Sequence, residues 1–142
     1  MNIKRCAIAA SLSLAVAIGM APTVATAADA SPDATTEVFN RAIENIPGKS
    51  LIAVEVNYGP GEKSGAHRHE ESAFIMAYVV SGAIRSQVEG EPAQVYTAGQ
   101  TWYENPGAHH VVSENASETE PAKLLAVFVV DTEHGDLTTL DD

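Results

Sequence analysis

The chain has 142 residues, a typical length for one globular domain, and 45% of them are hydrophobic. Its 19 acidic residues outnumber its 8 basic ones and give a formal net charge of −11. Such a surface repels phosphate backbones and anionic lipid headgroups. We therefore expect no nucleic-acid partner, and the charge argues against binding to a membrane surface.

The first 27 residues predict a secretory signal peptide. Lys4 and Arg5 precede the uncharged apolar run "AIAASLSLAVAIG". Residues 25–27 ("ATA") fit a small-residue cleavage site, and residues 28–30 ("ADA") are a second option. The apolar run is shorter than the roughly 20 residues that span a bilayer, which argues against an uncleaved anchor. We expect a periplasmic or secreted protein that has no membrane partner once residues 1–27 are removed.

The mature chain predicts a mobile leader (residues 28–36), one all-β domain (residues 37–131) and a loosely ordered acidic tail (residues 132–142). Cys6, the only cysteine, lies in the signal peptide, so no thiolate is available to bind metal or act as a nucleophile. Short β-rich runs alternate with Gly- and Pro-containing turns, and no long run has helical period. This pattern is typical of a small antiparallel β-barrel or jelly roll. The runs include "LIAVEVNY", "AFIMAYVV", "AIRSQV", "QTWYE", "AHHVV" and "AKLLAVFVVD".

Three segments of the mature chain allow more specific predictions. Val54, Val56 and Tyr58 alternate with polar residues, as in a half-buried strand. The run at residues 124–130 ("LLAVFVV") is apolar on both faces, so we expect a central strand. The segment from residue 37 to residue 46 precedes the main strands and could add to a sheet edge of its own or a neighbouring chain. From this segment we expect a homodimer.

Four of the five histidines lie in two short stretches. His67 and His69 are two residues apart, so on an extended strand both imidazoles lie on one face and can bind one metal ion. In the second stretch, only one of the adjacent residues His109 and His110 can face the same way. A third imidazole from that stretch would leave open coordination positions. Taken alone, the first pair also fits a polar pair beside a surface turn.

The first stretch resembles the first motif of the cupin superfamily, G-x5-H-x-H followed by a Glu and a Gly. Gly61, His67 and His69 match it, and Gly82 fits the closing glycine. The motif's Glu is missing, because "AFI" occupies residues 73–75 where it should fall. The resemblance extends over residues 51–131 and implies a cupin barrel.

The second stretch resembles the second cupin motif, G-x5-P-x-G-x2-H-x3-N. Gly99, Gly107 and His110 match at the right spacing. Asn105 stands where the motif has Pro, and Glu114 stands where it has Asn. Together, the two motifs imply a divalent metal ion held by three histidines and no carboxylate. The three ligands would be His67, His69 and His110.

A three-histidine site is similar to that of certain thiol and diketone dioxygenases of the superfamily. Three neutral imidazoles leave the full charge of the metal, which favours an anionic or enolisable bidentate ligand. Imidazole ligands suit Fe, Ni, Cu or Zn, and Mn is also possible. We expect an exported cupin that acts on a small oxygenated molecule as a metal-dependent dioxygenase or isomerase. The alternative is a non-catalytic module that binds a small molecule or metal, because the sequence offers no assigned general base.

Other polar and aromatic residues have simpler interpretations. His109 is the alternative to His110 as ligand. Glu71 shares strand parity with His69 and could be a fourth ligand, although a solvated carboxylate fits it better. Glu104 is expected at the rim or surface, and His134 on the surface of the tail. Barrel packing is expected for Tyr78, Trp102, Tyr103 and Phe128, and inward-pointing side chains for Arg85 and Gln87.

Overall fold

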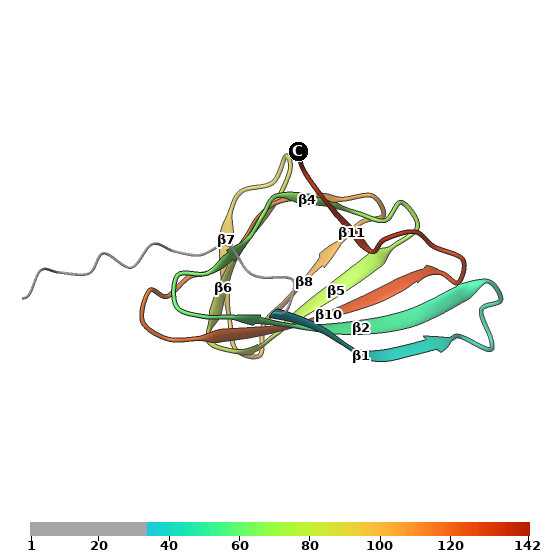
Figure 1. The fold of residues 1–142 in the computed structure, drawn as a ribbon, viewed down its shortest axis with the longest axis horizontal. Helices are drawn as coiled ribbons and strands as arrows, with labels where there is room; N and C mark the ends of the chain where they lie inside the picture. Colours follow the sequence, from blue (N-terminus) through green and yellow to red (C-terminus); the bar gives the residue numbers. More distant parts are fainter. Residues whose placement is uncertain (1–33) are drawn as a thin grey trace, which may run out of the picture.

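The computed structural model describes residues 34–142, which form two antiparallel sheets that face each other across a common interior (Figure 1). The predicted signal peptide lies outside the described residues. No helix in the described part of the chain is long and apolar enough to cross a membrane. The prediction of an all-β antiparallel barrel of the jelly-roll type is confirmed.

The first sheet has five strands. Its middle strand is the run that the sequence analysis expected to be central, and it pairs with its neighbours over most of its length. In spatial order the strands are β1 (Thr35–Ala42), β2 (Lys49–Tyr58), β10 (Ala122–Asp131), β5 (Phe74–Ser81) and β8 (Thr101–Glu104).

The second sheet carries both histidine stretches on adjacent strands. In spatial order it contains β11 (Thr138–Leu140), β4 (His67–His69), β9 (His109–Asn115), β6 (Ala83–Val88) and β7 (Gln94–Thr97), and β3 (Lys63–Ser64) also pairs with β9. Segments that are about forty residues apart in sequence are therefore direct neighbours here, because β4 pairs with β9.

Alternating side chains from the two sheets fill the interior. On β5 the burial alternates residue by residue, and on β10 buried and half-buried positions alternate in the same way, as expected for strands with one face toward a core. At the β5–β6 turn, Gly82 has φ of +71°, and a Cβ there would lie 2.6 Å from the carbonyl oxygen of Pro121. Only glycine fits this turn. The most deeply buried apolar side chains are Ile52, Ile75, Val79, Ile84 and Val130.

Several expectations about single side chains are wrong. Tyr78 and Tyr103 do not pack in the barrel, since they are 38% and 63% exposed on its outer face. On β6 the inward positions belong to Ile84 and Ser86, so Arg85 is exposed. Gln87 bonds the backbone at the surface. Trp102 and Phe128 are buried, as expected.

Both ends of the described chain are more regular than the sequence suggested. β1 already begins at Thr35, within the segment expected to be a mobile leader, and it pairs with β2 of its own sheet. The tail is not loosely ordered throughout, because residues 138–140 form β11 and pair with β4. This short strand brings the C-terminal segment next to the histidine strand.

Candidate metal centre

The three histidines expected from the sequence lie together inside the barrel. His67 is paired directly with His110 across β4 and β9, and His69 follows His67 on the same face of β4. The three side chains are buried, and one ring nitrogen from each lies within 4.8 Å of the others. Their ring centroids are 4.8 to 6.0 Å apart. This separation is suitable for binding one ion between the rings.

The alternative ligands lie elsewhere. His109 points away from the cluster, and its Nε2 lies 2.8 Å from a carboxylate oxygen of Asp141. Glu71 is exposed, near Gly107. Of the adjacent histidine pair, the fold therefore brings His110 to the cluster, because neighbouring residues on a strand face opposite sides.

Backbone carbonyl groups orient the two histidines of β4. His67 Nδ1 lies 2.7 Å from the carbonyl oxygen of Gly65, and His69 Nδ1 lies 3.3 Å from that of Leu137. A carbonyl oxygen only accepts, so the short His67 contact favours the tautomer with the proton on Nδ1 and a lone pair on Nε2. Such outer hydrogen bonds are typical of metal-binding histidines. The Leu137 contact comes from the segment just before β11.

Glu104 is a fourth polar group at this cluster, and the expectation that it lies at the rim or surface is wrong. It is 3% exposed. The indole Nε1–H of Trp102 donates to its Oε1 at 3.0 Å. Its Oε2 lies 3.1 Å from His69 Nε2, and its Oε1 lies 3.4 Å from His110 Nδ1. Strand parity could have predicted this burial, because Glu104 lies two residues after the buried Trp102 on β8 and therefore faces the same side.

The interior changes the protonation of the cluster. Burial lowers the pKa of His67 below its usual value. Burial also lowers the pKa of His110, to about 4, although the nearby Glu104 carboxylate opposes this shift. For Glu104, burial raises the pKa, but the nearby rings of His69 and His110 outweigh it, so the pKa lies below its ordinary value. Near neutral pH, the cluster therefore combines neutral imidazoles at His67 and His110 with a carboxylate anion at Glu104.

One contact indicates that this cluster suits a cation. Among the described residues, Glu104 Oε2 is the buried side-chain oxygen that has no hydrogen-bond partner. Nε2 of His69 lies 3.1 Å from it. A buried carboxylate oxygen and an imidazole nitrogen this close are stable when a proton on Nε2 or a metal ion lies between them. Nitrogen and carboxylate donors in one place are typical ligands of first-row divalent metals.

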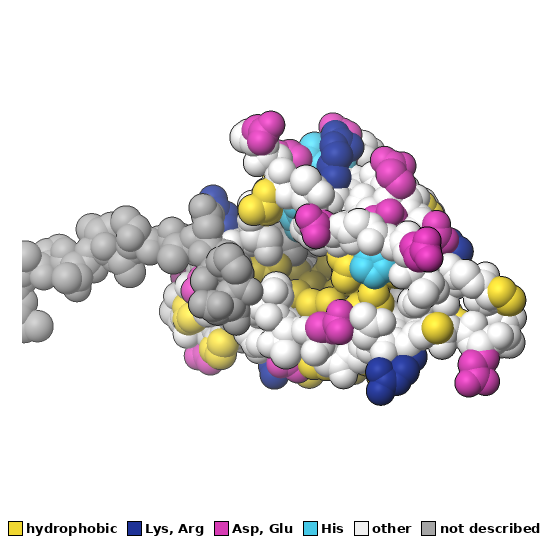
Figure 2. All heavy atoms as spheres, turned by 45° about the vertical axis from the view of Figure 1, so that its right-hand side comes forward, with side chains coloured by type: hydrophobic (Ala, Val, Ile, Leu, Met, Phe, Trp, Pro, Cys, Tyr) yellow, Lys and Arg dark blue, Asp and Glu magenta, His cyan; other side chains and the backbone are white. Residues whose placement is uncertain are grey.

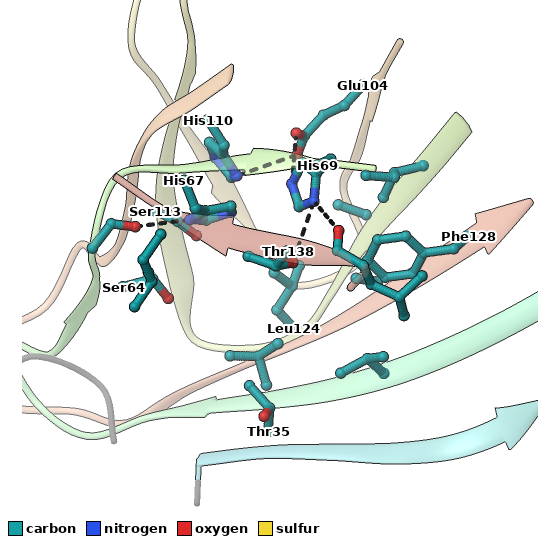
Figure 3. A pocket seen from close by; sticks show the side chains of 18 of the residues that line it. Thr35, Ser64, His67, His69, Glu104, His110, Ser113, Leu124, Phe128 and Thr138 are labelled. Atoms are coloured by element: carbon teal, nitrogen blue, oxygen red, sulfur yellow. Dashed lines mark hydrogen bonds and ion pairs between the residues drawn. The ribbon is translucent and has the colours of Figure 1, made fainter. Parts of the chain in front are cut away.

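The cluster lies at one end of a pocket of about 520 Å³. Figure 2 shows a hollow in the surface with hydrophobic side chains on its floor. The imidazoles and Glu104 line one part of the pocket, and Thr138 borders it from β11 (Figure 3). The apolar lining comes mainly from Val54, Val56, Ile75, Leu124, Ala126, Phe128, Leu137 and Leu140.

An antiparallel two-sheet barrel with a buried histidine cluster in its pocket defines a class of small β-barrel proteins with an internal binding site. Residues 54–128 match the family model described as the cupin domain. This match extends over more than half of the chain, and the chain therefore belongs to the cupin domain family. The resemblance inferred from the two motifs is confirmed at this level. A search of the curated proteins finds no match.

Solved structures share the fold at low sequence identity. A protein with a double-stranded β-helix domain from Klebsiella pneumoniae is 19% identical, with 79% of this chain and 88% of that chain covered and a TM-score of 0.59. The DMSP lyase DddQ from Ruegeria pomeroyi is 21% identical, with 63% of this chain covered and a TM-score of 0.54, and this chain spans only 42% of its length. An oxalate oxidase in complex with glycolate is 20% identical, with 78% and 56% covered and a TM-score of 0.54. At these identities, the similarities show a shared fold alone.

Proposed function

We propose that this cupin binds one divalent metal ion through His67, His69 and His110, with the Glu104 carboxylate at the same site. The observation that carries the proposal is the 3.1 Å approach of Glu104 Oε2 to His69 Nε2, which brings a carboxylate oxygen and an imidazole nitrogen together as two possible ligand atoms for one cation. The candidate metals are Fe, Ni, Cu, Zn and Mn. Carboxylate binding would leave a divalent ion with one net positive charge, which favours an anionic ligand.

We infer further that the metal site serves an enzyme acting on a small oxygenated molecule, as a metal-dependent dioxygenase or isomerase. The bound metal would supply Lewis-acid or oxygen-binding chemistry. Glu104 is ionised, so it can accept a proton from a ligand held beside it. Apolar side chains line most of the remainder of the pocket. The oxalate oxidase structure with glycolate supports a small oxygenated acid as the first compound to test.

A non-catalytic binding module remains the second candidate, and one observation favours it. Glu104 is the only carboxylate among the residues that line the described pocket, and no Lys or Arg lines it. If Glu104 is fully used as a metal ligand, the pocket keeps no general base. Retained metal with no turnover of any small oxygenated substrate would support this reading.

Elemental analysis of protein purified from its native compartment tests the metal proposal. We expect close to one equivalent of a first-row metal per chain. Oxygen-uptake and isomerisation screens with small hydroxy and oxo acids then test the enzyme. Protein that takes up no first-row metal, even after incubation with each candidate ion, contradicts the metal centre.

We also propose export and a mature chain that begins near Ala28, based on the apolar run and the small-residue site at residues 25–27. The location would be periplasmic or secreted. Intact-mass measurement of the exported protein is the test. A mass that still includes residues 1–20 contradicts this proposal.

A further inference from the structure

Three hydroxyl groups from three strands meet in a second part of the same pocket. The Tyr58 hydroxyl lies 2.8 Å from Ser64 Oγ and 2.9 Å from Ser113 Oγ. Tyr58 and Ser113 are 2% and 4% exposed, and all three residues line the pocket. The proposed metal centre uses none of them. Buried hydroxyls at a pocket wall are well placed to orient a ligand.

The hydrogen-bond capacity of this hydroxyl cluster is not used up internally. Each hydroxyl has one proton to donate, so Tyr58, Ser64 and Ser113 together have three. The two oxygen–oxygen contacts among them use one proton each. One proton therefore remains for an acceptor outside the cluster, whichever oxygen carries it. Since the cluster borders the pocket, an oxygen atom of a bound molecule is the natural acceptor.

Strand β9 connects the hydroxyl cluster to the histidines. Ser113 follows His110 by three residues on β9, and both side chains are buried. A bulge separates them, so their Cα atoms are roughly 7–10 Å apart. In Figure 3, Ser64 and Ser113 lie beside His67, on the side away from Glu104. Between and below these polar groups, apolar side chains such as Leu124 line the pocket.

We propose that Tyr58, Ser64 and Ser113 form a second binding subsite, which donates one hydrogen bond to an acceptor oxygen at the far end of the ligand. This inference rests on the proposed metal centre, which would hold the near end. The ligand class is then a small molecule with a metal-chelating oxygen group, a short apolar middle and a second, uncharged oxygen. A carbonyl, ester or ether oxygen fits the second subsite.

A second carboxylate fits it poorly. None of the described residues that line the pocket is Lys or Arg, so a second anion would be buried without a cationic partner. The Glu104 carboxylate in the same pocket adds like-charge repulsion. The hydroxyl cluster therefore selects against dicarboxylic acids and for molecules with one charged or chelating end.

Two catechols of similar shape test the subsite. Both chelate metal through two oxygens, but 3,4-dihydroxyacetophenone carries a carbonyl oxygen where 4-ethylcatechol carries only an apolar arm. Titration calorimetry with the zinc-loaded full chain, under anaerobic conditions, measures both affinities. We expect wild type to bind the acetyl compound at least about fivefold more tightly than it binds the ethyl compound, because one net hydrogen bond contributes about that much.

The triple variant Tyr58→Phe/Ser64→Ala/Ser113→Ala removes all three hydroxyls and leaves no partner unsatisfied. We expect it to keep its zinc and its affinity for 4-ethylcatechol, but its ratio of acetyl-compound to ethyl-compound affinity should fall about five- to tenfold below the wild-type ratio. Comparing the ratio of affinities between proteins cancels the different acidities of the two catechols. The matched control Thr139→Val removes a hydroxyl from β11 outside the pocket and should keep the preference.

Other results overturn the inference in distinguishable ways. If the triple variant keeps the wild-type preference, or wild type has none, the hydroxyls only stabilise the barrel. If wild type holds zinc but binds neither catechol, the subsite is wrong while the metal centre stands. If wild type holds no zinc, the proposed function fails, and the subsite that depends on it fails with it.

Discussion

Glu104 Oε2 and His69 Nε2 approach to 3.1 Å in the interior of the barrel, so either a proton on Nε2 or a bound cation must lie between them. His69 Nδ1 lies 3.3 Å from the carbonyl oxygen of Leu137, and this acceptor favours a proton on Nδ1. Trp102 anchors the other carboxylate oxygen. With the proton on Nδ1, the close approach of Oε2 and Nε2 is stabilised by a bound cation.

Removing any one of the three imidazoles should empty the metal site. His67→Ala, His69→Ala and His110→Ala should each lower bound metal by at least about tenfold, since each ring supplies one nitrogen ligand. Metal-to-protein ratios measured by mass spectrometry give the result. His109→Ala and His134→Ala are the controls and should retain wild-type metal. Full metal content in all three ligand variants would mean that the cluster is only a polar part of the barrel interior.

Glu104→Gln should weaken metal binding and stabilise the metal-free protein. We expect metal affinity to fall by about tenfold or more, because a neutral amide replaces a charged oxygen. We also expect the metal-free protein to gain about 1 kcal/mol of stability, since the new N–H can donate to His69 Nε2. Metal titration and urea unfolding measure the two effects. Glu71→Gln, an exposed change, should alter neither.

An unchanged metal affinity in Glu104→Gln has a clear meaning. The three imidazoles would then be sufficient ligands, as the sequence analysis expected, and Glu104 would act on the ligand instead of the metal. A loss of turnover with retained metal would identify Glu104 as the proton acceptor.

The metal-free protein should lose stability as the pH falls from about 6.5 to about 4. The folded state holds His110 with a pKa of about 4, below the ordinary unfolded value of 6.5. Between these values the unfolded chain binds more protons, so the free energy of unfolding decreases as the pH falls. Protonation of His110 alone should lower the free energy of unfolding by on the order of 3 kcal/mol across this pH range.

Urea unfolding of chelator-treated protein between pH 7 and pH 4 measures this slope. His110→Gln should flatten it, whereas His134→Gln should not. A wild-type stability that stays level across this range would mean that His110 takes up its proton without unfolding. His67, whose pKa is also lowered by burial, should add to the slope in the same direction.

The C-terminal segment should affect the metal site through His69. The carbonyl oxygen of Leu137 accepts from His69 Nδ1 and from the Glu70 backbone N–H. Ending the chain at Asp136 removes this acceptor and β11, so metal affinity should fall by roughly 10- to 100-fold, as for other lost outer hydrogen bonds. Removal of Asp142 alone is the control. Metal binding that survives the longer truncation, with the barrel intact by circular dichroism, contradicts this role.

We predict a homodimer, and the structure suggests which surface to test. The segment at residues 37–46 was expected to add to a sheet edge, and β1 pairs with β2 of its own chain. The outer face of β5 and β8 exposes several apolar side chains, and on it Phe74 and Tyr103 stack at 5.8 Å. Large exposed apolar patches are uncommon on monomers. The face includes Phe74 at 43% exposure, Met76 at 37%, Tyr78 at 38%, Val80 at 44% and Tyr103 at 63%.

Light scattering at micromolar concentration should give twice the mass of one chain. Tyr103→Glu should shift the protein to a monomer, because it places a charge on the apolar face. Arg85→Glu, an exposed change on the other sheet, should leave the mass unchanged. A wild-type protein that is monomeric under these conditions rules out the homodimer.

The sequence alone determined the fold class and the histidine part of the site. Strand period, turn residues and two spaced motifs act locally, and their consequences can be read along the chain. The i, i+2 spacing placed His67 and His69 on one face. The second motif selected His110 over His109, and the doubly apolar run of β10 indicated a central strand.

The tertiary structure alone decided which other groups surround those histidines. Glu104 comes from β8 in the opposite sheet, and it reaches the cluster only because the two sheets face each other. Leu137 belongs to an acidic tail with little strand character, and it meets His69 only through the pairing of β11 with β4. Local patterns show which way a side chain faces. The partner that it faces depends on long-range packing, to which residues distant in sequence contribute.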